Sequence, residues 1–218
     1  MSKINLKQNI YPGLFIDIEG PDGCGASTQI ALLKKWLVVK GVKVFNTKEP
    51  TDNVIGGLIR GALTRVYSLP LSALQLLFVA DRIHHLHREV TPILKKKGRN
   101  VLLTDRYLWS TVAFGAVNLD RDWLIGLHRD CYLPDITIFL KVSPKVLANR
   151  LKNDRFDLQL FERVKTLKKV WQNYEWLAKK FRKDVFIVNV DGDPDPEKVF
   201  QDIMEILLKN KKFKKFSQ

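Results

Sequence analysis

The sequence is poor in cysteine, with only Cys24 and Cys131 among its 218 residues. Two cysteines exclude a disulfide framework, and their spacing excludes a cysteine-based metal site. A run of about eighteen apolar residues, which a membrane-spanning helix needs, is also missing. The start of the chain, MSKINLKQNIYPG, has no apolar core of signal-peptide length. We therefore expect no membrane association and a cytoplasmic location.

Acidic residues are in the minority, since 23 Asp and Glu stand against 37 Lys and Arg, for a net charge of +14. This excess favours anionic partners such as nucleotides. Five lysines lie in the last ten residues without an acid among them: Lys209, Lys211, Lys212, Lys214 and Lys215. We expect residues 209–218 to form a solvated basic tail, which is too weak a signal for a nucleic-acid-binding module.

Five short apolar runs alternate with longer stretches of helical periodicity. The expected strands are residues 14–19, 42–47, 100–104, 136–140 and 185–190. Helices are expected over residues 31–40 and 72–97, ending near Gly41 and Gly98, and further helices should begin near Pro144 and Pro196. This alternation predicts an α/β fold with a five-stranded parallel sheet covered by helices on both faces. No linker or repeat interrupts it, so we expect one domain over residues 10–208 after an N-terminal extension of residues 1–9.

A glycine-rich turn follows the first expected strand. Gly20, Gly25 and Ser27 fit the phosphate-loop pattern G-x-x-x-x-G-K-[ST], but Ala26 stands where the pattern has lysine. Glycines allow positive φ and close approach of backbone N–H groups to an oxyanion, and the following helix adds its positive end. The hydroxyl of Ser27 is of the kind that binds Mg²⁺. The residues expected to bind phosphate are Gly20, Pro21, Asp22, Gly23, Cys24, Gly25, Ala26, Ser27 and Thr28.

Polar side chains also follow the second and third expected strands, as residues 47–52 (TKEPTD) and 104–107 (TDRY). In open parallel sheets ligands bind beyond the carboxyl ends of the strands. Three polar clusters at strand ends therefore predict one shared site.

With these clusters in place, the chain resembles the thymidylate kinase family of P-loop nucleoside-monophosphate kinases over nearly its full length. The matching segments occur in the family's order: FIDIEGPDG, TKEP, IGGLIR, LLFVADR, TDRY with Ser110, PDITIFL and DRFD. The resemblance implies transfer of the ATP γ-phosphoryl group to dTMP with Mg²⁺, and a homodimer. It assigns Mg²⁺ to Ser27 and Asp105, and the expected catalytic residues are Asp105, Arg106, Arg155 and Lys48.

The resemblance also implies an acceptor site. Phe78 and Arg82 share one face of a helix, because they lie four residues apart, and could hold the base by stacking and hydrogen bonding. Ser110 is expected to reach the base, Asp22 to lie near the sugar 3′-hydroxyl, and Tyr107 to crowd a ribose 2′-hydroxyl. The expected substrate-binding residues are Asp22, Glu49, Arg60, Phe78, Arg82, Arg106, Tyr107 and Ser110.

Residues 150–163 (RLKNDRFDLQLFER) resemble the lid that closes over ATP in this family. In one branch of the family the lid supplies an arginine that the phosphate loop lacks, and here Cys24 occupies that loop position. Arg150 and Arg155 are the candidates. Closure of such a lid excludes water and limits wasteful hydrolysis.

Three features depart from the family pattern. Loss of the lysine at Ala26 should cost roughly 2–4 kcal/mol, or about 10²–10³ in rate, unless Lys48 or Lys152 replaces its charge. Phe114-Gly115 replaces a tyrosine-glutamine pair, which leaves base selectivity open. Asp17 lies inside the first strand, where we expect a basic or hydroxyl partner.

Two other functions therefore stay open. One is a nucleotide-binding homologue with impaired catalysis, and the other is a kinase for another deoxynucleotide or deoxynucleoside.

Overall fold

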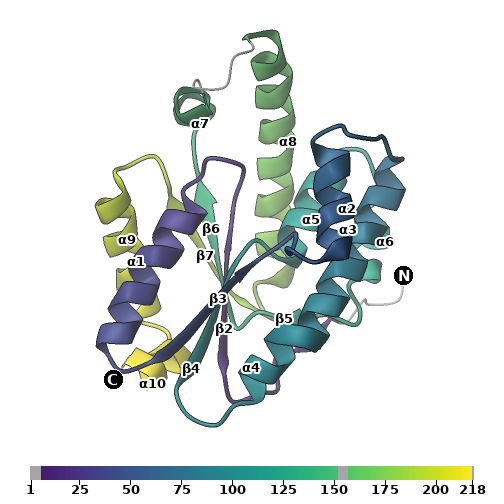
Figure 1. Ribbon diagram of the computed structural model, residues 1–218. Coiled ribbons are helices and arrows are strands. Elements are labelled where there is room, and N and C mark those ends of the chain that lie inside the picture. Colours follow the sequence, from purple (N-terminus) through teal and green to yellow (C-terminus); the bar gives the residue numbers. More distant parts are fainter. Residues whose placement is uncertain (1–5, 152–156, 218) are drawn as a thin grey trace.

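A computed structural model describes residues 6–151 and 157–217 (Figure 1). Its centre is a parallel five-stranded sheet in the order β3-β4-β2-β6-β7. The strands are β2 (Leu14–Glu19), β3 (Lys43–Lys48), β4 (Asn100–Asp105), β6 (Ile136–Lys141) and β7 (Phe186–Asp191). A short parallel pair joins β1 (Lys7–Gln8) to β5 (Tyr132–Leu133). The predicted five-stranded parallel sheet is confirmed, with β3 and β7 beginning one residue later than expected.

Helices cover both faces of the sheet (Figure 1). One face carries α1 (Ala26–Val39), α9 (Pro196–Leu207) and α10 (Lys211–Ser217). The other carries α3 (Leu71–His85), the π-helical turn η1 (Leu86–Val90), α4 (Thr91–Lys95), α5 (Leu108–Gly115), α6 (Arg121–Leu127) and the C-terminal part of α8 (Asp157–Phe181). Helix α2 (Val54–Leu63) packs against α3, and α7 (Pro144–Leu151) follows β6.

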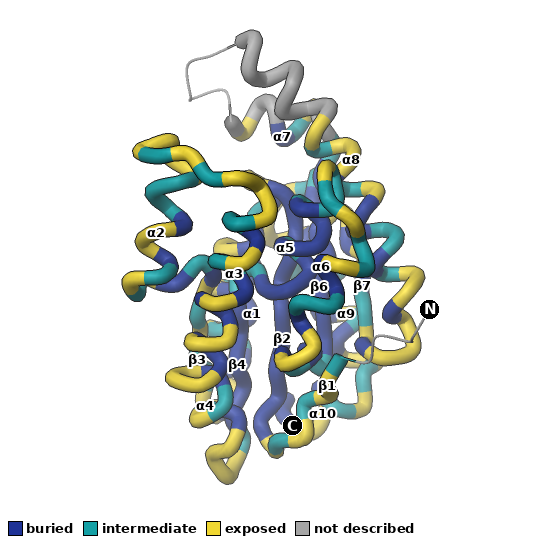
Figure 2. Tube along the Cα trace, turned by 90° about the vertical axis from the view of Figure 1, so that its right-hand side faces the viewer, coloured by how far each residue is buried: buried dark blue, intermediate teal, exposed yellow. Residues whose placement is uncertain are grey.

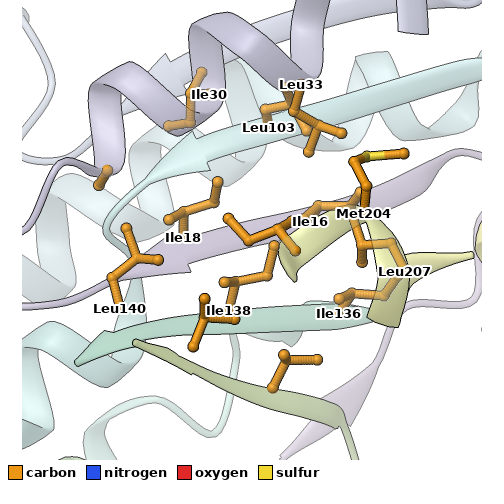
Figure 3. Packing of buried hydrophobic residues seen from close by; sticks show 14 of the residues in the cluster. Ile16, Ile18, Ile30, Leu33, Leu103, Ile136, Ile138, Leu140, Met204 and Leu207 are labelled. Carbon is orange, nitrogen blue, oxygen red and sulfur yellow. The ribbon is translucent and has the colours of Figure 1, made fainter. Parts of the chain in front are cut away.

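Strand β2 supplies side chains to two separate cores. All six of its residues are buried, and successive side chains point to opposite faces. Leu14, Ile16 and Ile18 pack toward α1 and α9, and Figure 3 shows Ile16 and Ile18 among side chains of these helices. Figure 2 shows the same strand buried along its length. The alternation places the acidic residues Asp17 and Glu19 inside the second core, together with Phe15.

The expected helix over residues 72–97 is divided into three parts. Helix α3 ends at His85, η1 continues it with π-helical hydrogen bonding, and α4 ends at Lys95. Pro92 lies just after the π-helical turn, and because proline has no N–H group, the regular α-helical hydrogen bond cannot form at this position. The first helix begins at Ala26 rather than at residue 31, because Gly25, with φ of 92°, ends the loop directly before it.

The expectation of a solvated tail is wrong for residues 211–217, which form α10. Phe213 and Phe216 are three residues apart, share one helical face and are buried. The Phe213 ring stacks on Trp36 at a centroid distance of 6.1 Å. Arg99 donates a hydrogen bond to the carbonyl oxygen of Phe216 at 2.6 Å. Within residues 6–151 and 157–217 no helix is long and apolar enough to cross a membrane.

Candidate active site

The loop after β2 has the backbone that phosphate binding requires. Gly23 and Gly25 have φ of 79° and 92°, and Gly25 directly precedes α1. A Cβ atom on Gly20 would lie 2.7 Å from the Cys24 Sγ atom, so only glycine fits there. Burial raises the pKa of Cys24 to about 11, which makes this side chain a packed thiol. The loop therefore offers its backbone N–H groups and the start of α1 to a ligand.

A cavity of about 720 Å³ opens beside this loop, at the end of the sheet from which α7 leads away (Figure 1). The loop residues 21–28 line it together with Asp105, Arg106 and Arg150. Arg150 donates hydrogen bonds to the carbonyl oxygens of Gly23 at 3.1 Å and Gly192 at 2.9 Å. Of the residues expected at the phosphates, Gly20 alone does not line the cavity.

One wall of this cavity was not predicted from the sequence. Residues 192–196 connect β7 to α9 and line it, and so do Val146 and Val199. The side chain of Asp193 accepts a hydrogen bond from the backbone N–H of Ser143 at 2.6 Å, which fixes this connection. This connection directly follows the fifth expected strand, and that position could have identified it, because ligands bind at the carboxyl ends of parallel strands.

Ala26 and Ser27 begin α1 at the floor of the cavity. Ala26 is buried and packs in the core with Ile30. Ser27 donates a hydrogen bond from Oγ to Asp105 Oδ2 at 2.5 Å. Hydroxyl and carboxylate oxygens are ligands suited to Mg²⁺, which usually keeps several waters and binds phosphate oxygens as well. No group of three or more His, Cys, Asp or Glu in the described ranges could hold a metal ion, so this pair fits Mg²⁺ only together with substrate oxygens.

The charges lining the phosphate-loop cavity are predominantly negative in the described part of the chain. The cations there are Arg106 and Arg150, and the carboxylates are Asp22, Asp105, Asp193 and Asp195. A triphosphate in this cavity would therefore depend strongly on backbone N–H groups, on a bound cation and on positive charge brought in from outside.

The other predicted cations lie elsewhere. Lys48 lies 3.4 Å from Asp52 and lines a separate cavity of about 710 Å³ that also reaches Ser27 and Asp105. Arg60 donates a hydrogen bond to the carbonyl oxygen of Thr51 at 2.6 Å. It lines neither the phosphate-loop cavity nor the cavity that Phe78 and Arg82 line. Arg155, Lys152 and most of the expected lid lie outside the residues whose side chains the structure describes.

A second cavity, of about 360 Å³, lies between α3, α5 and the segment after β3, and is called the base cavity below because Phe78 and Arg82 line it. Its lining includes seven of the eight expected substrate-binding residues, Arg60 being the exception: Asp22, Glu49, Phe78, Arg82, Arg106, Tyr107 and Ser110. Three further polar residues line this cavity and were not predicted from the sequence: Gln75, Thr111 and Asn118. Leucine and phenylalanine side chains form much of the wall, which suits a flat heterocyclic ligand.

Arg82 is fixed in place by its neighbours. Its NH2 group lies 2.6 Å from Glu49 Oε2 and donates to Thr111 Oγ1 at 2.9 Å. Its NH1 group lies 2.6 Å from His128 Nε2, which must be the acceptor because a guanidinium only donates. His128 then donates from Nδ1 to the Leu124 carbonyl oxygen, at 2.7 Å. Burial and the charge of Arg82 lower the pKa of His128 to about 3, which keeps this imidazole neutral.

Glu19 organises the start of α5, a function that the sequence analysis did not assign. Its Oε1 atom accepts hydrogen bonds from the backbone N–H groups of Tyr107 at 2.9 Å and Ser110 at 3.0 Å. Its Oε2 atom accepts from the hydroxyl groups of Ser110 and Tyr174. Burial raises the pKa of Glu19, while the hydrogen bonds from Ser110 oppose the rise. The signal was an acidic residue at the carboxyl end of a strand, where ligands of parallel sheets bind.

Arg106 joins the two cavities, since both its side chain and that of Asp22 line each of them. Its φ of 68° is left-handed, an uncommon conformation for a residue with a side chain. The guanidinium donates to Asp22 Oδ1 at 2.7 Å and to Ser110 Oγ at 3.2 Å. It also lies over the Phe114 ring, 5.5 Å from the centroid. A cation is thereby fixed at the junction.

Two buried groups beneath the base cavity have no hydrogen-bond partner in the described residues: the hydroxyl of Tyr107 and both carboxylate oxygens of Asp17. The expectation of a basic or hydroxyl partner for Asp17 is therefore wrong for the described residues. Burial and the nearby charges of Glu19 and Glu49 raise the pKa of Asp17 well above its usual value. The Tyr107 ring is buried against Phe15, so its expected contact with the sugar stays a prediction.

Comparison with known proteins agrees with this geometry. The thymidylate kinase family profile matches residues 18–203. The probable thymidylate kinase of Thermococcus gammatolerans is 36% identical over 204 residues, covering 89% of this chain and 96% of its own. That of Thermococcus onnurineus is 40% identical over 178 residues, covering 77% and 85%, and that of Pyrobaculum aerophilum is 32% identical over 201 residues, covering 92% and 99%. The chain belongs to the thymidylate kinase family.

Proposed function

We propose that this protein is an enzyme that transfers the γ-phosphoryl group of ATP to dTMP, giving dTDP and ADP. The observation that carries the proposal is the junction of the two cavities at Arg106 and Asp22. A phosphate-loop cavity suits the triphosphate of the donor, and the apolar cavity with Phe78 and Arg82 suits the base of the acceptor. Their shared wall lets donor and acceptor phosphates approach each other.

In this reaction an oxygen of the dTMP phosphate forms a bond to the γ-phosphorus, and the bond from that phosphorus to the β-phosphate oxygen breaks. ADP leaves with the electron pair of the broken bond. The protein has little covalent chemistry to perform, so alignment and stabilisation of negative charge supply the catalysis. Arg106 is placed to contact phosphate oxygens on both sides of the junction, and the backbone of residues 21–28 would hold the donor phosphates.

Mg²⁺ is part of the proposal, with Ser27 and Asp105 as the residues that would hold it, directly or through water. When bound, the ion would neutralise charge on the phosphates as they react. The short hydrogen bond between Ser27 and Asp105 keeps both oxygens at the edge of the cavity.

A second candidate function is supported by Ala26, whose methyl group is packed in the core where the pattern has lysine. With more carboxylates than cations on the described lining of the phosphate-loop cavity, a nucleotide-binding homologue with impaired catalysis is the alternative. A kinase for a deoxynucleoside fits less well, because Arg106 at the junction would then lack an acceptor phosphate to bind.

One experiment separates these candidates. The purified protein is assayed for ADP release with Mg²⁺ and ATP against dTMP, dUMP, dCMP and thymidine, and binding of ATP and dTMP is measured by calorimetry. The proposal expects binding of both nucleotides and turnover with dTMP as the best acceptor. Binding without turnover at high enzyme concentration would favour the impaired homologue, and turnover with thymidine alone would favour the nucleoside kinase.

We also propose a cytoplasmic homodimer. Leu76 and Ile83 of α3 lie seven residues apart on one helical face and are 49% and 44% exposed, and Leu58 of the adjacent α2 is 46% exposed. An exposed apolar face of this kind suits a second copy of the chain. Light scattering on the eluting protein should give twice the chain mass of 25.2 kDa. Both cysteines are free thiols, which agrees with a reducing compartment.

A further inference from the structure

Gln75 is a buried polar residue of the base cavity for which neither the fold nor the proposed reaction gives a reason. It lies on α3, three residues before Phe78 and seven before Arg82, so the three side chains share a helical face. It is only 6% exposed and lines the cavity with both of them.

The carboxamide of Gln75 has hydrogen-bonding capacity that the protein does not use. Its Oε1 atom is buried and has no hydrogen-bond partner in the described residues. Buried polar atoms are almost always paired, so an unpaired one calls for a ligand or a water. The NH1 and NH2 groups of Arg82 are bound to His128, Glu49 and Thr111, and Ser110 is held by Glu19, so neither side chain is free to turn as Gln75 is.

Gly115 on α5 makes the room that Gln75 occupies. A Cβ atom at position 115 would lie 3.2 Å from the Cδ atom of Gln75 and 3.0 Å from a methyl carbon of Leu124. Any side chain there would therefore press on the carboxamide from the facing helix. Glycine at this position leaves the amide in contact with the cavity.

We propose that Gln75 reads the edge of the pyrimidine base, with its carboxamide bound to the ring while the ring stacks on Phe78. A carboxamide offers one acceptor and a pair of donors. The amide oxygen can accept from the N3–H group of thymine while the amide nitrogen donates to the 4-keto oxygen. This inference rests on the proposed acceptor class and adds the residue that recognises its base.

The test measures the dissociation constant of dTMP by calorimetry without ATP, so that it does not depend on turnover. Gln75→Leu keeps the approximate size but removes both hydrogen bonds, and about tenfold weaker dTMP binding is expected. Binding of ATP to the same variant should not change, because Gln75 does not line the phosphate-loop cavity. Gln201→Leu is the matched control, since Gln201 is exposed on α9.

Gln75→Glu is a second variant that keeps the polar character of the side chain. A carboxylate only accepts, so one oxygen could accept from the N3–H group of thymine while the other would repel the 4-keto oxygen. The dissociation constant of dTMP should therefore rise by about tenfold. If Gln75→Leu does not fold, as followed by circular dichroism, this dissociation constant decides the question.

The possible failures can be told apart. Wild-type protein that binds dTMP without phosphorylating it would contradict the proposed catalysis and leave the assignment of Gln75 standing. A dTMP affinity equal to that of wild type in Gln75→Leu or in Gln75→Glu would overturn the assignment of Gln75 alone. Wild-type protein that does not bind dTMP would overturn both.

Discussion

The two cavities that meet at Arg106 are built in different ways. The phosphate-loop cavity, about 720 Å³, is lined by backbone of a glycine turn and by more carboxylates than cations in the described residues. The base cavity, about 360 Å³, is lined by apolar side chains and by polar groups such as Arg82 and Ser110 that other side chains hold in place. The proposed acceptor side is thus largely fixed by the fold, whereas the proposed donor side needs charge that its described residues do not supply.

The origin of this difference lies in the secondary structure that forms each cavity. Side chains on α3 and α5 pack on the sheet and are tied to Glu19, Glu49 and His128, so their positions are set by the core. The phosphate loop instead has small residues, and of its acidic neighbours Asp193 holds the backbone N–H group of Ser143 and Asp195 caps α9. Substitutions should therefore act differently on the two sides.

The largest effect is expected from Arg106→Met, which removes the one guanidinium shared by both cavities. Loss of a group that stabilises developing charge should lower kcat/KM by about 10³-fold. Steady-state kinetics with each substrate varied in turn would measure it, with Arg129→Met, at an exposed position, as the control. A defect confined to the KM of one substrate would contradict the placement of Arg106 at a shared junction.

The donor side alone is tested by Ala26→Lys. A lysine at the start of α1 would restore the ammonium group that the phosphate-loop pattern contains, and kcat should rise by about 10²-fold. The KM of dTMP should not change, because Ala26 does not line the base cavity. Ala26→Met has a similar length without the charge and should not activate. An unchanged kcat in Ala26→Lys would mean that another cation already fills this function.

The acceptor side alone is tested by Phe78→Ala. Stacking of a base on an aromatic ring contributes ~1–3 kcal/mol, so the KM of dTMP should rise by about 10- to 100-fold. Ser72→Ala, at an exposed position of the same helix, serves as the control. If the KM of ATP rose as much as that of dTMP, the two cavities would not be independent.

The smallest effect is expected from Asp17→Asn, beneath the base cavity. The pKa of Asp17 is raised in the folded protein, so wild-type stability should fall as the pH rises above the unfolded value of 3.8. An amide does not ionise, so the variant should melt about 2–4 °C higher than wild type at pH 8. The gain should shrink toward pH 4 in thermal denaturation experiments. Asp184→Asn, on the surface, is the control, and a gain independent of pH would contradict the explanation.

The sheet and the phosphate loop were predictable because their signals are local. An apolar run such as residues 14–19 can be buried on both faces only in a covered sheet, and a strand followed by spaced glycines has few other uses. Strand ends also identified Asp105, Arg106 and Glu49, since parallel topology brings these ends together.

Contacts that depend on packing were not predictable. Helix α10 has seven residues, too few to be stable alone, and forms because Phe213 stacks on a tryptophan distant in sequence. The burial of Gln75 depends on how α3 faces α5, and no local pattern encodes this. Asp17 looked like a strand residue in need of a basic or hydroxyl partner, and only the folded chain reveals that the carboxylates of Glu19 and Glu49 lie near it instead.

The placement of α10 has a practical consequence for handling the protein. Ser217 is buried, and Phe216 is held through its carbonyl oxygen by Arg99. An affinity tag joined to the carboxyl end would therefore begin at a packed position and press on the hydrophobic contact with Trp36. A tag at the amino end leaves this contact intact, and a deletion of the final ten residues would expose the core that the two phenylalanines cover.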